Sequence, residues 1–347
     1  MEIKRVLLPD LLKGVAAVFL VQVHITEFFI DNAGHESLWG KTSLFLGGPF
    51  AAMVFMIVMG YFVARNKKTP KENLVRGIKI FALGFLLNIG LNFHLLWKII
   101  FDGWPYNPWQ YVFGVDILYL AGIAIIVLSA LKQVKKGQEW ASISLFFVIV
   151  GLSGFMNIKL LVTETNYVLP FIAGDYSWSY FPVFPWLAYP VLGFFIALQM
   201  ERIKVFVLHQ KIYSFILFTV TAVSVLLFGR MGIHTSINLP DYYHHTYTFT
   251  FWALGLVFLW AMLLLFVSEK FAKSKPVIFL CWIGRNITVF FVIQWLIIGN
   301  IATAIYQTKS MDSFIFYFLS IFCVTVLLTY VYEKLISRLT FTSKKSS

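Results

Sequence analysis

Charged residues are scarce in this 347-residue sequence, and their scarcity excludes most soluble folds. Asp, Glu, Lys and Arg make up 13% of the chain, whereas 59% of the residues are hydrophobic and 18% are aromatic. A water-soluble domain carries about 25% charged residues, because its surface must be solvated. The mean hydropathy is accordingly high, at +0.80. The composition therefore predicts an integral membrane protein.

Cysteine and acidic residues are also rare. The two cysteines, Cys281 and Cys323, lie in hydrophobic segments, so the sequence predicts neither a disulfide framework nor a cysteine metal cluster. The stretch DYYHHTY, residues 241–247, could hold a metal through Asp241, His244 and His245. This is the weaker interpretation, because no second segment supplies a ligand. We therefore expect no metal. The net charge of +12 is spread over short segments, which argues against a nucleic-acid partner and favours contact with anionic lipid.

Hydrophobic segments of about 20 residues recur along the whole chain, and each is long enough to cross a bilayer as a helix. About ten spans are expected: residues 6–29, 44–64, 74–96, 111–131, 140–158, 181–200, 210–229, 248–268, 277–299 and 312–335. Because no Ser- and Gly-rich linker divides them, we predict an all-α, polytopic helical bundle that forms one domain over residues 1–340. A short disordered cytoplasmic tail is expected over residues 341–347.

Positive residues indicate the orientation of this bundle, since Lys and Arg are retained on the cytoplasmic side of a membrane. With the N terminus inside, most of the 28 Lys and Arg residues fall in segments that would be cytoplasmic, whereas the outer loops hold few. Both termini are therefore predicted to be cytoplasmic. We expect a multi-pass protein of the cytoplasmic membrane of a bacterium.

The first hydrophobic segment, LLPDLLKGVAAVFLVQVHITEFF, contains four ionisable residues on one face. At about 100° per residue, Lys13 and His24 lie about 20° apart around the helix axis, and Asp10 and Glu27 fall within the same arc of roughly 100°. A charge at membrane depth costs at least about 2.5 kcal/mol, so this face should contact protein or a water-filled cavity instead of lipid. An interfacial ion pair is the simpler alternative for Asp10 and Lys13.

Lys13 and His24 are separated by roughly 17 Å along this helix, at about 1.5 Å per residue. We expect one passage that runs past Lys13 at its inner end to His24 at its outer end. Arg76, Lys79 and Arg285 lie near the inner side of other expected spans, and Asp116 lies near the outer side. If these faces converge, a positive inner pocket would suit a phosphate-bearing cytosolic ligand, and an outer histidine with carboxylates would suit proton abstraction.

Simpler interpretations of these four residues stay open. Arg76 can belong to the charges of an inner loop, and Lys79 can extend to the membrane surface. Asp116 and Arg285 can serve in packing. Similarly, Trp104, Tyr106 and Trp109 of an outer loop can stack on sugar rings or mark the membrane interface, where aromatic residues gather. The list of residues alone does not choose between these roles.

Three stretches of the sequence resemble a known group of membrane enzymes. The opening LLPDLLKGVAAVFLVQVH resembles the first span of transmembrane acyltransferases, where an aspartate, a basic residue and a histidine occur in this order. SYFPVFPWLAYPVLGFFIA resembles the FPxxPWLxYxxxG signature of the heparan-alpha-glucosaminide N-acetyltransferase branch. GGPFAAMVFMIVMGYFVAR resembles the second span of that branch and of the acyltransferase-3 branch. The resemblance covers most of the chain.

The resemblance implies that an acyl group, usually acetyl from cytosolic acetyl-CoA, is transferred to a hydroxyl or amine of a glycan or lipid-linked sugar outside the cytoplasm. It implies that His24 is catalytic, either as general base or as acyl carrier, and that Lys13 and Asp10 belong to the donor pocket. Lys13 stands where these families usually have arginine, which keeps the charge but loses the bidentate hydrogen bonding.

Two sets of site residues follow from the pattern and the resemblance together. The catalytic set is His24, Asp116 and Glu27. The set that would hold the acyl-CoA is Lys13, Asp10, Arg76, Lys79 and Arg285. The expected partners are the lipid bilayer, an acyl-CoA and a carbohydrate acceptor. A proton- or substrate-coupled transporter is the alternative function, because intramembrane Asp, Lys, His and Arg also build proton relays.

Overall fold

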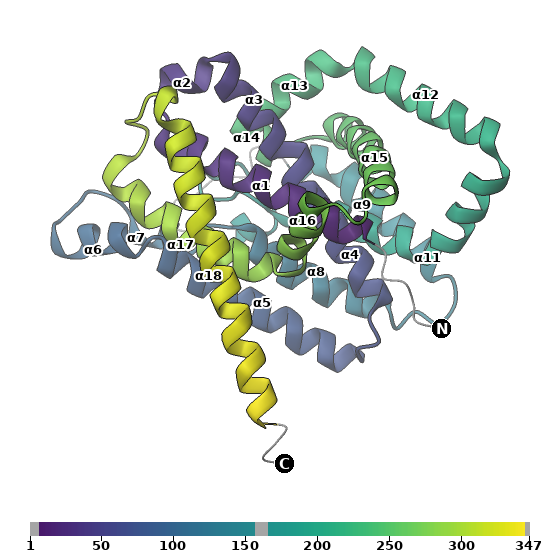
Figure 1. The fold of residues 1–347 in the computed structure, drawn as a ribbon, viewed down its shortest axis with the longest axis horizontal. Helices are drawn as coiled ribbons and strands as arrows, with labels where there is room; N and C mark the ends of the chain where they lie inside the picture. The colour runs from purple at the N-terminus through teal and green to yellow at the C-terminus, as the bar shows by residue number, and fades with distance from the viewer. Residues whose placement is uncertain (1–6, 157–165, 344–347) are drawn as a thin grey trace.

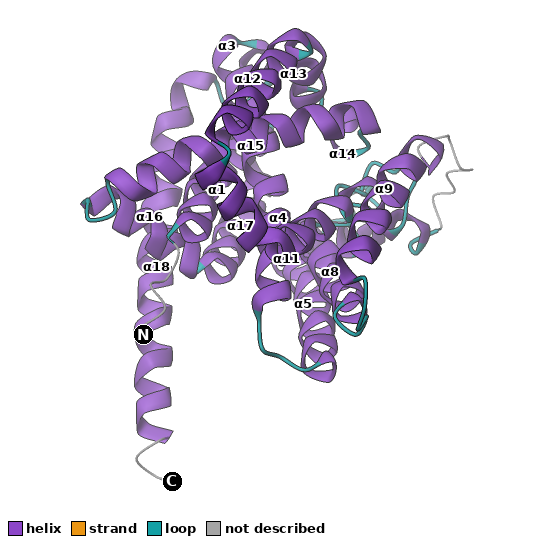
Figure 2. Cartoon of the chain, turned by 90° about the vertical axis from the view of Figure 1, so that its right-hand side faces the viewer, coloured by secondary structure: helices purple, strands orange, loops and turns teal. Residues whose placement is uncertain are grey.

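The structure is a computed structural model that describes residues 7–156 and 166–343. Over these residues the chain folds into helices joined by loops and turns, as Figure 2 shows. The predicted all-α class is therefore confirmed. Eight helical segments are long and apolar enough to cross a membrane, and a ninth is counted if a bent pair of helices forms one span.

The eight segments that could each cross a membrane run the length of the described chain. They are α1 (Leu8–Phe29), α3 (Leu38–Gly47) joined through the π-helical turn η1 (Gly48–Met53) to α4 (Val54–Arg65), α5 (Pro70–Leu91), α9 (Gln138–Met156), α10 (Val183–Trp186) with α11 (Ala188–His209), α15 (Tyr247–Lys270), α17 (Ile287–Ile305), and η3 (Met311–Ser313) with α18 (Phe314–Ser343). The bent pair is α12 (Lys211–Leu227) and α13 (Gly229–Ile237), which meet at 63°.

Several of the ten expected spans differ in shape from the expectation. The segment 74–96 is divided between α5 and α6 (Phe93–Phe101) at Asn92, and 181–200 between α10 and α11. The segment 111–131 is helical as α8 only over Ile117–Leu131, which at 15 residues is shorter than a full span. The segment 277–299 contains two helices, α16 (Lys275–Arg285) and α17, with a break at Asn286. These interruptions could not be predicted from hydrophobicity. A continuous hydrophobic segment indicates that its residues are buried or contact lipid, but not where the helix stops and restarts.

Short helices fill the connections between the spans. They are α2 (Asn32–Glu36), α6 (Phe93–Phe101), α7 (Pro108–Val112), the 3₁₀ turn η2 (Leu169–Phe171) and α14 (Leu239–Tyr243). Helix α5 begins with a capping box, in which the Thr69 hydroxyl accepts from the Glu72 N–H at 3.3 Å and the Glu72 carboxylate accepts from the Thr69 N–H at 2.7 Å. This cap fixes the start of the helix that carries Asn88 to the site.

Helix α1 lies at the centre of the bundle (Figure 1), where α3, α16, α17 and α18 pack around it. Leu11, Ala17, Val21 and Ile25 on α1 are buried, with at most 1% of each side chain exposed. Its first half meets α16 at closest approach through Gly14 and Gly284. A Cβ atom on Gly14 would collide with the Leu280 carbonyl, and one on Gly284 would collide with the Asp10 carbonyl. Only glycine allows the two backbones to approach this closely.

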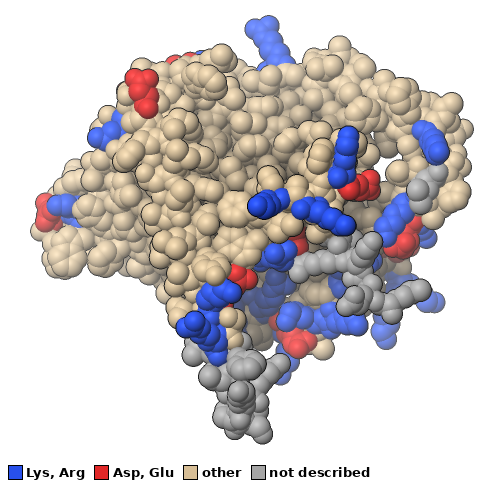
Figure 3. Space-filling model, in the orientation of Figure 1, with Lys and Arg blue, Asp and Glu red and all other residues tan. Residues whose placement is uncertain are grey.

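The described chain begins and ends at the same end of the bundle. Beyond α1, the Asp31 N–H donates to the Lys309 carbonyl at 2.8 Å, so the second end of α1 lies beside the start of α18. At the other end, the Trp282 indole on α16 donates to Glu333 of α18 at 2.7 Å. Most of the Lys and Arg side chains visible in Figure 3 gather on the side toward which α18 runs. The cytoplasmic placement of this side stays a prediction.

Candidate active site

His24 lies in the second half of α1 and is held in place by α17. Its Nδ1 lies 3.1 Å from Gln294 Oε1, so with this amide orientation Nδ1–H is the donor. The imidazole also stacks on the Trp295 indole, with ring centroids 3.9 Å apart and planes inclined by 30°. In the tautomer that donates Nδ1–H to Gln294, Nε2 carries the lone pair. The hydrogen bond and the stacking together fix the orientation of the ring.

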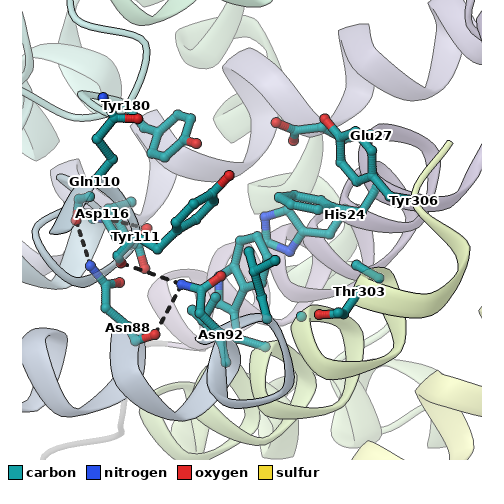
Figure 4. Close-up of a pocket in the computed structure, with 18 of the residues that line it drawn as sticks. His24, Glu27, Asn88, Asn92, Gln110, Tyr111, Asp116, Tyr180, Thr303 and Tyr306 are labelled. Carbon is teal, nitrogen blue, oxygen red and sulfur yellow. Dashed lines mark hydrogen bonds between the residues drawn. The ribbon is translucent and has the colours of Figure 1, made fainter. Parts of the chain in front are cut away.

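A cavity of about 390 Å³ opens beside His24. Its walls come from α1, α5, α7, α17 and the loops around residues 104–106 and 180–181. Figure 4 shows how the polar side chains surround it. They are His24, Glu27, Asn88, Asn92, Gln110, Tyr111, Asp116, Tyr180, Tyr243, Thr303 and Tyr306. Tyr106 and Tyr306 are more than half exposed and lie at its mouth.

Two carboxylates line this cavity with His24. Glu27 lies one turn further along α1, and its Oε1 accepts from the Tyr243 hydroxyl at 3.4 Å. Asp116 caps α8, and its Oδ1 accepts from the Ile117 N–H at 2.6 Å. The other oxygen, Oδ2, is buried and has no hydrogen-bond partner among the described residues. The structure thus brings the whole predicted catalytic set, His24, Glu27 and Asp116, to one cavity.

The loop that carries Asp116 is fixed from two sides. The Asn88 amide on α5 donates to the carbonyls of Val112 and Gly114, at 3.1 and 2.7 Å. On the other side, the Val115 N–H donates to the Trp178 carbonyl at 2.7 Å, and the Phe181 N–H donates to the Val115 carbonyl at 3.0 Å. These contacts explain why the hydrophobic segment 111–131 is interrupted between α7 and α8.

The segment that resembles the FPxxPWLxYxxxG signature forms one wall of the site. Tyr180 and Phe181 line the cavity, and the Trp186 indole donates to the Tyr243 carbonyl at 2.7 Å. Behind them, Tyr189 OH lies 2.8 Å from His245 Nε2. The signature therefore positions the aromatic wall by packing and hydrogen bonds.

The histidine pair His244 and His245, between α14 and α15, takes part in packing instead of facing the cavity. His245 Nδ1 donates to the Tyr242 carbonyl at 2.7 Å, and burial lowers the pKa of this imidazole to about 3. His244 lies 4.0 Å from Asp175, while Asp241 accepts from Asn238. Over the described residues, no three His, Cys, Asp or Glu side chains are grouped as metal ligands would be.

The first half of α1 has different surroundings. Lys13 Nζ lies 3.1 Å from Asp10 Oδ1 and 4.9 Å from the centre of the Phe62 ring. The side chains are 14% and 1% exposed, so the pair is enclosed by protein. Along α1 the cavity lining extends from Phe28 only to Leu20, and neither Lys13 nor Asp10 is among the described residues that line it. Of the expected continuous passage, the structure shows the part next to His24.

The other residues predicted for the donor lie at two further places. Arg76 and Lys79 line a shallow groove on α5 together with Lys68, Lys71, Glu72 and Val75. Arg285 is exposed at the end of α16. The structure therefore does not gather the five predicted donor residues around one described cavity, and their role stays a prediction.

Several residues of the site were missed by the sequence analysis. Gln294 and Trp295 orient His24, and two asparagines line the cavity, Asn88 on α5 and Asn92 at the C-cap of this helix. Each amide is a polar residue inside a hydrophobic segment, which is the signal that singled out the ionisable residues of α1. Extending that signal from charges to amides would have found them.

A comparison with protein families shows which family the chain belongs to. A family model described as an acyltransferase domain matches residues 7–333, from the start of α1 to the last third of α18. The chain belongs to the acyltransferase-3 family. A search of the curated proteins found no match. The protein is thus a membrane-bound acyltransferase-3 protein, and membership implies acyltransferase activity and an acyl donor. It also favours acyl transfer over the transporter alternative.

Proposed function

We propose that this acyltransferase transfers an acetyl group from cytosolic acetyl-CoA to a hydroxyl or amine of an extracytoplasmic glycan or lipid-linked sugar, in the cytoplasmic membrane of a bacterium. The observation that carries the proposal is the fixed orientation of the His24 imidazole at the wall of the cavity. Gln294 and Trp295 fix the ring, Nδ1 is occupied, and the imidazole lines a cavity with two carboxylates. A general base needs this combination of fixed geometry and a free nitrogen.

In the proposed reaction, Nε2 of His24 removes the proton from the acceptor hydroxyl or amine. The acceptor oxygen or nitrogen attacks the thioester carbonyl, the carbon–sulfur bond breaks, and the proton passes from the imidazolium to the departing thiolate. The products are the acylated acceptor and the free thiol. In the second route, Nε2 itself attacks the thioester, the carbon–sulfur bond breaks and the thiolate leaves. The acceptor then attacks the acyl-imidazole, Nε2 is released, and the acceptor proton ends on the thiolate. Both routes use the same nitrogen.

On the donor side, Lys13 would attract the phosphates of the acyl-CoA, and Asp10 would hold the Lys13 ammonium in place. Arg76 and Lys79 on α5 and Arg285 on α16 add positive charge around the same end of the bundle. The donor and the acceptor would therefore approach His24 from opposite ends of α1.

The test compares the surface glycans of cells that express the wild-type protein, His24→Ala or His209→Ala. His209 is exposed at the end of α11, so it serves as the matched control. We expect mass spectrometry to show the mass of one acetyl group on a glycan with the wild-type and His209→Ala proteins. Loss of the general base should reduce this signal by about 10²-fold or more. Unchanged acetylation by His24→Ala, at equal amounts of folded protein in the membrane, would contradict the proposal.

A further inference from the structure

The charge of the cavity lining restricts which acceptor can enter. Two carboxylates, Glu27 and Asp116, face this space with His24, and no Lys or Arg is among the described residues that line it. An anionic group that entered would lose its hydration without meeting a cation, and it would lie near two acidic side chains. Unpaired like charges of this kind are how a binding site rejects a ligand.

Asp116 supplies a specific hydrogen-bond acceptor in this cavity. One of its oxygens is engaged by the Ile117 N–H at 2.6 Å, and the loop around it is held by Asn88, so the carboxylate is fixed before any ligand arrives. The second oxygen is buried without a hydrogen-bond partner among the described residues. A buried acceptor of this kind costs free energy until a donor reaches it. A hydroxyl or ammonium group of a ligand would provide that donor.

The remaining walls suit a ring that has both polar edges and apolar faces. Tyr111 and Tyr180 lie between Asp116 and Glu27 in Figure 4, and Trp104 and Tyr106 stand at the mouth. Aromatic side chains offer flat apolar surfaces, and Asn92 and Gln110 add amide groups beside them. The volume of about 390 Å³ lies within the range of sites for small molecules.

We infer that this cavity is the acceptor subsite for a sugar that carries no negative charge, and that Asp116 binds this sugar through one of its hydroxyl or ammonium groups. The inference rests on the proposed function, because it takes the acceptor as the ligand of the cavity. It goes further by assigning the acceptor to neutral and amino sugars and by excluding uronic acids and sugar phosphates. Asp116 is then a specificity-determining residue that faces His24 across the cavity.

The experiment measures binding without the acyl donor, so that its outcome does not depend on catalysis. Purified full-length protein in lipid nanodiscs is titrated with methyl glucoside, glucosamine, glucuronic acid and glucose 6-phosphate, and binding is followed by saturation-transfer NMR. We expect signals from the neutral and the amino sugar and none from the two anionic sugars at the same concentrations. Equal or stronger binding of the anionic sugars, or binding of none of the four, would overturn the inference.

Two variants locate the binding. Asp116→Asn should weaken binding of the neutral and amino sugars by about 10-fold or more, because a charged hydrogen-bond acceptor is replaced. Asp312→Asn, in η3 and away from the described cavity lining, should bind like the wild type and is the control. Equal binding by all three proteins would contradict the role of Asp116.

If the sugars bind as expected but no acyl group is transferred, the proposed function fails while the subsite stands. If the enzyme transfers the acyl group only to an anionic glycan, the proposed function stands while the assignment of the subsite to uncharged and amino sugars fails.

Discussion

In its second half α1 presents His24 and Glu27 to an open cavity, whereas in its first half Asp10 is buried next to α16 and Lys13 lies over the Phe62 ring of α4. Both halves carry ionisable side chains on the same face of one helix. The two halves differ in the helix that packs against them. Helix α17 leaves space beside His24, while the glycines of α1 and α16 bring two backbones into contact beside Asp10.

Under the proposed function, this difference means that the acyl donor and the acceptor bind at sites of different kinds. The cavity next to His24 is preformed and needs only a ligand. The lining stops at Leu20, which is about 10 Å along the helix axis from Lys13, and Ala16 and Ala17 in between are fully buried. Under the proposed function, an acyl group that comes from the end of Lys13 must pass this stretch. Donor binding should therefore be coupled to an opening between α1 and the helices packed on it.

The largest effect is expected from a substitution that disrupts the packing of the first half of α1 against α16. Gly284→Ala places a Cβ atom against the Asp10 carbonyl, and this overpacking should cost about 1–3 kcal/mol of stability. Gly151→Ala on α9 is the control, because its Cβ would meet nothing within 4 Å and the helix should gain about 0.5–1 kcal/mol. Thermal midpoints of the detergent-solubilised proteins should fall for Gly284→Ala and stay level or rise for Gly151→Ala. Equal midpoints would mean that the close approach does not stabilise the fold.

The next effect tests the positioning of His24 in the second half. Gln294→Met keeps the length of the side chain but removes the oxygen that receives Nδ1–H, so the ring can turn away from the reacting geometry. We expect kcat to fall by up to about 10²-fold, with little change in the KM of either substrate. Gln294→Glu keeps an oxygen acceptor and should retain most of the activity. If Gln294→Met instead keeps full activity, Gln294 acts through packing alone and its hydrogen bond to His24 is not needed.

The ionisable face of α1 could be predicted from the sequence, but the contrast between its two halves could not, and this has a physical cause. Charges in a hydrophobic segment are costly, so Asp10, Lys13, His24 and Glu27 stood out, and their helical spacing placed them on one face. Spacing within one helix does not reveal which neighbour covers each half. That depends on contacts between distant segments, such as Gly14 with Leu280, which a single sequence does not display.

The same limit explains the rest of the fold and the site. Hydrophobicity predicted about ten spans, whereas eight helical segments, or nine with the bent pair, are long and apolar enough to cross a membrane. It also did not show that Asn88 holds the turn between α7 and α8, inside the expected span 111–131. Asp116 was identified by its charge and was grouped with His24 and Glu27, and all three line one cavity. Residue type thus singled out the ionisable groups, and tertiary contacts decided which of them line the cavity.

A third experiment separates the two halves kinetically. Lys13→Ala removes the ammonium next to Asp10, so under the proposed function the KM for the acyl donor should rise by about 10-fold, which corresponds to about 1.4 kcal/mol. The affinity for the sugar should not change, because Lys13 is not among the described residues that line the cavity. Lys13→Arg keeps the charge and should stay close to the wild type. Initial rates at varied donor concentrations measure the effect, and an unchanged donor KM in Lys13→Ala would remove this residue from the donor site.

The smallest expected effect tests the mouth of the cavity and decides between the two interpretations of the outer aromatic residues. Trp104 lines the cavity, whereas Trp109 is 55% exposed and is not among the described lining residues. If Trp104 stacks on the incoming sugar, Trp104→Ala should raise the KM of the acceptor by about fivefold, since an aromatic contact contributes about 0.5–1.5 kcal/mol. Trp109→Ala should leave this KM unchanged. An equal, small effect of both substitutions would instead assign both indoles to the membrane interface, because that role depends on depth in the bilayer and not on contact with the cavity.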